Sequence, residues 1–367
     1  MAESDLILAI VVATALTFDF TNGFHDTANV VATSISTRAM SPRIAVGFAA
    51  LLNFAGAFIS LEVAATVAED IVDPLAITTT VIFAGLIGAI AWNLITWYFG
   101  LPSSSSHALI GGVVGATFAA AGVDGIFGEG ILGEVLVPAV VAPILAFVVG
   151  GIGIVVCYRI VGRQRPGPVT RGFRFGQVIS GGLLALAHGT NDAQKTMGVI
   201  TLALVANGNL SSDGFEVPIW VVISAATAIA LGTYTGGWRI IRTMGTRIIK
   251  MDAAQGFSAQ GAGAAVILAS SHFGFPLSTT QVIAGGVMGA GAGKRLSAVR
   301  WGVAGNMVVA WLLTLPAAGA IGAVTYLVTD LFPGAVGPLL ISALGTMLAA
   351  VAFVRRVRRG VPVPAAA

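Results

Sequence analysis

Residues 22–29 read NGFHDTAN and residues 188–195 read HGTNDAQK, two similar polar stretches inside otherwise apolar sequence. Asp26 aligns with Asp192 at an offset of 166 residues. A charged side chain within a bilayer costs roughly 2.5–3.5 kcal/mol on insertion scales, and by default it marks a functional site. Its recurrence in register predicts a site between the two halves of a duplicated membrane protein.

The composition of the chain supports a membrane location. Of its 367 residues, 56% are hydrophobic and 10% are charged, whereas soluble chains carry about 25% charged residues. The apolar runs are continuous rather than alternating, which argues against a β-barrel. We therefore predict an all-α polytopic protein with roughly ten to twelve membrane helices. Runs long enough to cross a bilayer lie at 44–61, 75–98, 135–156, 217–235 and 335–354.

Basic and acidic residues occupy different loops, which predicts the topology. By the positive-inside rule, the basic loops and the C-terminus are cytoplasmic, and the acidic loops and the N-terminus are external. We expect this orientation in the plasma membrane. The net charge of +3 is then a topology signal, and nucleic acid is not an expected partner. Of 19 Lys and Arg, 18 lie at 38–43, 159–174, 239–250, 294–300 and 355–359, and acidic segments lie at 3–5, 62–73, 124–134 and 213–216.

A second pair of segments predicts two helical hairpins. Residues 102–107 read PSSSSH, residues 276–281 read PLSTTQ, and seven positions in and after them are identical at an offset of 174. The first segment lies between two acidic loops and the second between two basic ones. Each is therefore expected to enter and leave the membrane on one side, from opposite faces, as a re-entrant or broken helical hairpin.

These motifs divide the chain into inverted-topology repeats. We expect a first repeat at 1–158, a basic cytoplasmic loop at 159–175, a second repeat at 176–360 and a disordered tail at 361–367. The motif and hairpin lie at 22–29 and 100–116 in the first repeat, and at 188–195 and 274–290 in the second. Inverted repeats whose broken helices meet near the midplane are typical of secondary transporters.

The hairpin tips carry hydroxyl groups just after a proline. Ser and Thr cap helix starts, and the free N–H groups of a helix N-terminus bind anions. The tips therefore suit a small oxyanion such as phosphate or sulfate. The candidate substrate ligands are Ser104, Ser105, Ser106, Ser278, Thr279 and Thr280.

The carboxylates beside such an anion indicate a coupling cation. Helical spacing places Asp19 and Asp26 on one face, and Asp192 and Lys195 complete a site with a fixed charge of about −2. Such charges coexist with an anion at low dielectric only if cations are present, which predicts symport with Na⁺, H⁺ or a divalent metal bound to the anion. An anion channel is more often lined with Arg or Lys alone.

The glycines of the motif stretches and the absence of Arg from them are also informative. Gly23 and Gly189 allow either a local break or a close backbone approach. The four motif stretches contain no Arg. A lipid phosphatase would need a nucleophile or an acid–base group supported by Arg, so we do not expect an enzyme of this kind. A transporter remains.

These motifs resemble the inorganic phosphate transporter (PiT) family, whose hallmark is a duplicated Gly-x-Asn-Asp-x-x-Asn motif followed by a Pro-x-Ser-Thr-Thr-like hairpin. The resemblance spans essentially the whole chain. It implies a homodimeric symporter without a covalent cofactor that works by alternating access, with phosphate held between the two hairpin tips. It also implies roles in cation binding or coupling for Asp26, Asn29, Asn191 and Asp192, the two aspartates being Na⁺ ligands if sodium is coupled.

Two departures from that motif bear on the coupling ion. His25 stands where the family has Asn, and Lys195 stands where the second motif ends in Asn. These variants resemble the low-affinity bacterial branch, which is thought to use H⁺ and neutral metal–phosphate complexes. A permanent ammonium at Lys195 would replace one Na⁺ and His25 would take a proton, so H⁺ is favoured over Na⁺. The alternative is a sulfate or other oxyanion permease on the same scaffold.

Overall fold

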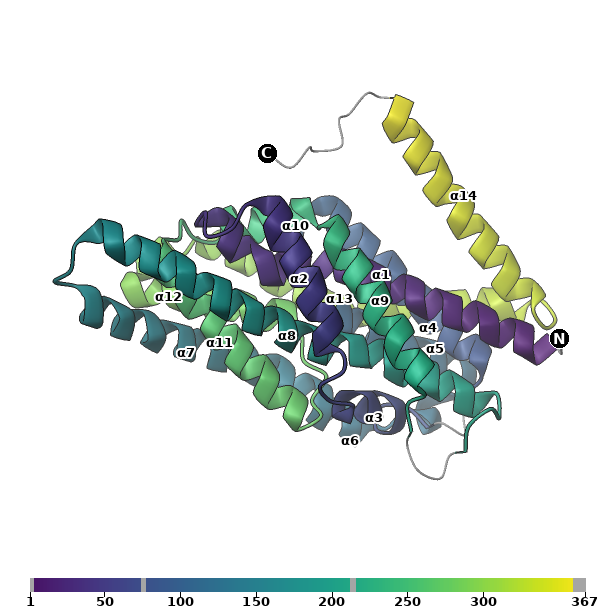
Figure 1. Cartoon of the computed structure of the whole chain (residues 1–367). Coiled ribbons are helices and arrows are strands. Elements are labelled where there is room, and N and C mark those ends of the chain that lie inside the picture. Colours follow the sequence, from purple (N-terminus) through teal and green to yellow (C-terminus); the bar gives the residue numbers. More distant parts are fainter. Residues whose placement is uncertain (1–2, 74–76, 212–215, 359–367) are drawn as a thin grey trace.

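The computed structural model describes residues 3–73, 77–211 and 216–358, and the predicted tail at 361–367 lies outside them. All the long elements in this part of the chain are helices, which confirms the all-α prediction (Figure 1). The helices are α1 (Glu3–Ser36), α2 (Pro42–Gly56), α3 (Glu62–Glu69), α4 (Thr79–Phe99), α5 (Ser105–Ala121), α6 (Gly128–Gly130), α7 (Val137–Val161), α8 (Pro166–Ala206), α9 (Ile219–Thr235), α10 (Trp238–Arg242), α11 (Ala253–His272), α12 (Thr279–Lys294), α13 (Trp301–Asp330) and α14 (Val336–Arg358).

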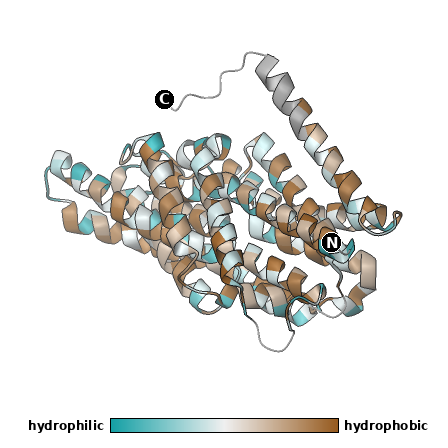
Figure 2. Ribbon diagram, turned by 45° about the vertical axis from the view of Figure 1, so that its right-hand side comes forward, coloured by the Kyte–Doolittle hydropathy of each residue, from teal (hydrophilic) through white to brown (hydrophobic). Residues whose placement is uncertain are grey.

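Many large hydrophobic side chains are exposed on the bundle, as a lipid-facing surface requires, and apolar stretches run along most of its helices (Figure 2). By length and composition, five described helices qualify as membrane spans, or six if one bent pair is counted. This is fewer than the ten to twelve predicted. The difference arises because α2, α9 and α12 have only 15, 17 and 16 residues, and because α8 and α11 carry buried polar side chains.

The two motifs lie within long, unbroken helices. Residues 22–29 belong to α1 and residues 188–195 to α8, which have 34 and 41 residues. Gly23 and Gly189 therefore serve close approach rather than a break. A Cβ atom at Gly23 would collide with the backbone of α9 at Ile229, and one at Gly189 with the backbone of α2 at Asn53. Each motif helix thus packs against the helix that follows the other motif helix.

The predicted hairpins are formed by α4 with α5 and by α11 with α12. Their tips, at residues 100–104 and 273–278, end inside the bundle against α1 and α8. The second helix of each hairpin packs on a long helix of the other half, α5 on α13 and α12 on α7. Glycines make these crossings close: Gly115 meets the carbonyl of Gly319, and Gly289 meets that of Phe147.

Two features of the fold were not predicted. The chain bends by 59° between α9 and the helical segment Trp238–Arg247, where Gly236 has a φ of 73° that L side chains rarely adopt. In addition, α14 leaves the end of α13 and stands away from the bundle (Figure 1).

Candidate functional site

The tips of the two hairpins touch one another. Ser106 Oγ donates a hydrogen bond of 2.9 Å to the carbonyl of Leu277 in the other tip. His107 Nδ1 and Gln281 Nε2, which occupy matching positions at an offset of 174, lie 3.4 Å apart. The starts of α5 and α12 therefore converge at one place, from the two halves of the chain.

Serines cap both of these helix starts. Ser104 Oγ accepts from the backbone N–H of His107 at 3.0 Å, and Ser278 Oγ accepts from that of Gln281 at 3.3 Å. Capping fixes the first turn of each helix. It also leaves the other N–H groups of the first turn outside the helical hydrogen bonds, where an anion can accept from them.

The Asp26 carboxylate binds hydroxyls from both tips. Ser105 Oγ donates to its Oδ2 at 2.6 Å, and Thr280 Oγ1 lies 3.3 Å from its Oδ1. His25 Nδ1 lies 2.6 Å from the same Oδ1, and the other ring nitrogen lies 3.2 Å from the hydroxyl of Thr96 on α4. One carboxylate thus joins α1 to both hairpins.

The Asp192 carboxylate has an equivalent position on α8 but other partners. Thr279 Oγ1 donates to its Oδ2 at 3.1 Å, and Thr279 matches Ser105 at the offset of 174. His188 Nε2 lies 2.9 Å from Oδ2. The Lys195 ammonium pairs with Oδ1 and also donates to the Leu277 carbonyl at 2.9 Å. A fixed cation therefore links this carboxylate to a hairpin tip.

The two motif asparagines each hold a hairpin. Asn29 Nδ2 donates to Thr280 Oγ1 at 2.9 Å, and Asn191 Nδ2 donates to Ser271 Oγ at 2.9 Å and to the Phe275 carbonyl. In both cases the amide oxygen has no hydrogen-bond partner within the described residues. These oxygens are free to bind a cation.

The site as a whole is buried and acidic. All twelve predicted ligands and coupling residues are at most 3% exposed, so the site is closed to solvent. Asp26, His188 and Asp192 bring candidate ligand atoms within 4.8 Å of one another, which suits a metal ion. Two carboxylates so close repel each other unless a cation lies between or beside them.

The structure adds partners that sequence reasoning missed. The Thr96 hydroxyl contacts His25, and the Leu277 carbonyl accepts from Lys195. Thr96 lies outside every motif, and Leu277 lies within the second hairpin motif, but its apolar side chain gives no sign that its carbonyl has this role. Gln194, inside the second motif, accepts from the backbone N–H groups of Val63 and Ala64 at the start of α3. Its position in the motif was the available signal.

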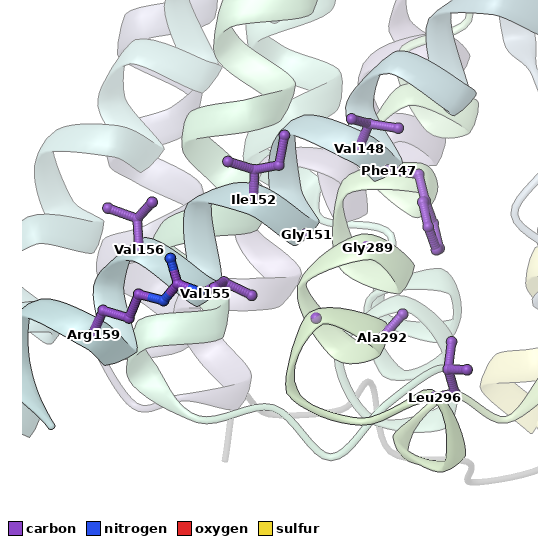
Figure 3. A pocket seen from close by; sticks show the side chains of 11 residues that line it. Phe147, Val148, Gly151, Ile152, Val155, Val156, Arg159, Gly289, Ala292 and Leu296 are labelled. Carbon is purple, nitrogen blue, oxygen red and sulfur yellow. The ribbon is translucent and has the colours of Figure 1, made fainter.

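A large groove lies away from this site. It has a volume of about 550 Å³ and is lined mainly by apolar residues of α7 and α12, with Arg159 at one end (Figure 3). None of the predicted site residues lines it. Arg159 is the only charged side chain that lines this groove, and no hydroxyl or carboxylate of the predicted site joins it there, so the groove is a poor candidate for the substrate site.

The comparisons with known proteins point to one family. A sequence model of the phosphate transporter family matches residues 22–171 and 163–322. A probable low-affinity inorganic phosphate transporter of Mycobacterium tuberculosis is 54% identical over 349 residues, 95% of this chain and 84% of that protein. A Bacillus subtilis relative of the same description is 45% identical over 329 residues, 89% of this chain and 98% of that protein.

The fold is similar to that of a solved structure. A sodium-dependent phosphate transporter superposes with a TM-score of 0.80 at 24% sequence identity, over 89% of this chain and 100% of that one. At this identity the likeness concerns the fold alone.

Proposed function

The chain belongs to the phosphate transporter family, and from that premise we propose that it imports inorganic phosphate in symport with a cation. It is a membrane protein with a transport function rather than an enzyme. The observation that carries the proposal is the meeting of two helix starts whose hydroxyls bond to two buried aspartates. Phosphate would lie between these tips.

The chemistry of the tips favours phosphate over sulfate. An ionised carboxylate only accepts hydrogen bonds. Phosphate at neutral pH keeps at least one proton, so it can donate to Asp26 or Asp192 while its other oxygens accept from Ser and Thr hydroxyls. Sulfate has no proton to donate and would face the carboxylates with charge repulsion alone. The sulfate permease therefore becomes the weaker alternative.

Binding requires the hydroxyls to change partners. Ser105, Thr279 and Thr280 donate to carboxylates in the closed site, and phosphate would take over these donors. The aspartates then need new partners, which a coupling cation supplies. This exchange gives a physical reason for symport, with Asp26, Asp192, Asn29 and Asn191 around the cation.

The arrangement of the two halves supports alternating access. We propose that 1–158 and 176–360 are inverted repeats joined by the basic loop. The equivalent contacts support this: Gly115 and Gly289, 174 residues apart, close on Gly319 and Phe147, which are 172 apart. Rocking of one set of helices against the other would open the tips to each side in turn. Homodimerisation and carriage of a metal–phosphate complex belong to the same proposal.

Uptake of labelled phosphate into liposomes that contain the purified protein tests the proposal. We expect accumulation above equilibrium when a cation gradient is imposed, either of H⁺ without Na⁺ or of Na⁺ at equal pH. Unlabelled arsenate should compete, and sulfate at the same concentration should not. Competition by sulfate alone, or uptake that never exceeds equilibrium, would contradict phosphate symport.

A further inference from the structure

The groove between α7 and α12 lies apart from the proposed phosphate site and opens on the outer surface of the bundle (Figure 3). Three of the side chains that line it, Ile152, Val156 and Leu296, are 59%, 46% and 68% exposed. Glycines bring the two helices together beneath it, since a Cβ atom at Gly293 would come within 2.7 Å of the carbonyl oxygen of Gly151. The groove is therefore an apolar channel, open along one side, whose floor is formed largely by backbone.

The length of the groove matches one leaflet of a bilayer. Its lining on α7 runs from Phe147 to Arg159, which corresponds to a rise of about 18 Å along the helix axis. The hydrocarbon core of a bilayer is about 30 Å thick, so one leaflet takes up about 15 Å of it. An acyl chain that follows the groove would therefore bring its headgroup to the level of Arg159.

The charges at this end of the groove suit an anion. Arg159 is exposed and takes part in none of the ion pairs found among the described residues. Neither α7 nor α12 contains Asp or Glu, and the exposed Arg163 and Arg295 lie just beyond their ends. Lys294 differs, because it is already paired with Asp252. A guanidinium matches the geometry of a phosphate group, so Arg159 offers donors to a phosphate at one end of an apolar channel.

The predicted topology places this end of the groove in the leaflet that carries anionic lipids. The basic segments 159–174 and 294–300, in which α7 and α12 end, are both cytoplasmic by the positive-inside rule. Anionic lipids of the cytoplasmic leaflet attract basic residues beside membrane helices. A second copy of the chain fits less well, because a two-fold axis along the bilayer normal would set the same basic ends against each other.

We propose that the groove between α7 and α12 binds an anionic phospholipid, with one acyl chain along the apolar floor and the headgroup phosphate on Arg159. The lipid would cover exposed apolar side chains of both helices. Because α12 begins at Thr279 in a hairpin tip, the lipid would also contact a helix that belongs to the buried site. The proposal does not depend on the substrate or on the coupling ion.

Photoaffinity labelling of the full-length protein in liposomes tests this site. The probes are phosphatidylglycerol and phosphatidylcholine with the same photoreactive acyl chain, used at equal amounts, and mass spectrometry locates the labelled residues. We expect phosphatidylglycerol to label the groove between Phe147 and Arg159 more strongly than phosphatidylcholine does. In Arg159→Gln the labelling by phosphatidylglycerol should fall about fivefold, whereas Arg159→Lys, which keeps the charge, should retain part of it.

Two further variants separate the groove from the general charge of this surface. Arg171→Gln is the matched control, since Arg171 is exposed on α8 in the same basic segment but does not line the groove, and its labelling should equal that of the parent. Ala292→Phe fills the groove without a change of charge, so it should lower the labelling by both lipids. Gel filtration of each purified variant is the control for folding.

Equal labelling of the groove by the two lipids, or unchanged labelling by phosphatidylglycerol in Arg159→Gln, would overturn the proposal. A groove that neither lipid labels would overturn it as well. Disulfide cross-linking of two copies through Ile152→Cys, in a Cys157→Ser background, would then identify a second copy of the chain as the occupant. These results concern lipid binding alone, so they are independent of whether the liposomes accumulate phosphate.

Discussion

Asp26 and Asp192 occupy equivalent positions, yet their partners differ. Asp26 lies beside the imidazole of His25, and Asp192 is paired with the ammonium of Lys195. The contacts from the two hairpin tips are alike. Ser105 donates a hydrogen bond to Asp26, and Thr279, at the matching position, donates one to Asp192. The two halves therefore share their means of holding the anion and differ in how they balance charge.

Replacement of either paired aspartate should abolish accumulation of phosphate. Asp26→Asn and Asp192→Asn each keep the shape of the side chain and lose the charge that attracts a coupling cation. Liposome uptake under H⁺ and Na⁺ gradients, with gel filtration of the purified variants as the control for folding, measures the effect. Near-normal accumulation by both variants would contradict the proposed role of the carboxylates.

Lys195→Asn should change the cation dependence of uptake rather than abolish it. The substitution removes the ammonium that pairs with Asp192, and a small cation can then take its place between Asp192 and the Leu277 carbonyl. We expect phosphate uptake by the variant to depend more strongly on Na⁺ than uptake by the parent, in which the Lys195 ammonium occupies this place. Identical Na⁺ and pH profiles in parent and variant would show that Lys195 does not stand in for a sodium ion.

The sequence was sufficient to identify the polar side chains of the site, but not to predict which hydrogen bonds they make. The motifs identified Asp26, Asp192 and the tip hydroxyls because polar residues in an apolar chain need a reason to be there. The backbone carbonyl of Leu277 and the hydroxyl of Thr96 carry no such signal, since side-chain type says nothing about which carbonyl faces inward. The sequence identified Asp19 as a carboxylate on the same helix face as Asp26, but only the structure shows that it makes no hydrogen bond with the hydroxyls at the tips.

At the scale of helices, glycine contacts decide how the hairpins are held. Gly115 on α5 and Gly289 on α12 each leave no room for a Cβ atom against a backbone carbonyl of the facing helix. The sequence identified these glycines as matching positions, because they recur at the offset of 174. Their facing helices could not be predicted, because pattern alone does not say which of many apolar helices packs where.

Adding one methyl group at these crossings should loosen the fold. Gly115→Ala and Gly289→Ala are each expected to destabilise the protein by about 1–3 kcal/mol through overpacking. Gly305→Ala on α13 is the matched control, since a Cβ atom there meets nothing within 4 Å, and alanine is favoured over glycine in a helix by about 0.5–1 kcal/mol. Thermal unfolding in detergent compares the three, and equal midpoints would refute the importance of the close crossing.

Helix continuity was harder to predict than helix existence. Gly23 and Gly189 lie in unbroken helices, whereas Gly236 and Gly237 stand at a bend. The difference lies in the backbone conformation, since the Cβ position of Gly237, like those of Gly23 and Gly189, is closed off by another backbone. At Gly23 and Gly189 another backbone occupies the space above the glycine, while Gly236 adopts a positive φ that ends α9. A glycine in sequence permits either outcome.

For the whole molecule, the predicted orientation still depends on the charges in the loops. Arg163 lies in the turn between α7 and α8, and Glu129 lies in the segment before α7; both are exposed. The positive-inside rule predicts that Arg163 is cytoplasmic and that Glu129 is external. The chain has one native cysteine, Cys157. Once Cys157 is replaced, a single new cysteine can be introduced and labelled at a chosen position.

Cysteine labelling in intact cells should report that orientation. In a Cys157→Ser background, a membrane-impermeant maleimide should label Glu129→Cys from outside and should leave Arg163→Cys unlabelled until the cells are opened. Phosphate uptake by the Cys157→Ser parent is the control for function. The opposite labelling pattern would reverse the predicted topology.

The crossing of α1 with α9 has a consequence for biosynthesis. The ribosome completes α9 about 200 residues after Gly23, which at about 5–20 residues per second is a delay of roughly 10–40 s. During this time Asp26 lacks its contact with Thr280 of the second half, and a carboxylate on α1 without its partners is costly near lipid. Neither half can reach its native packing alone, because long helices of each half pack on helices of the other.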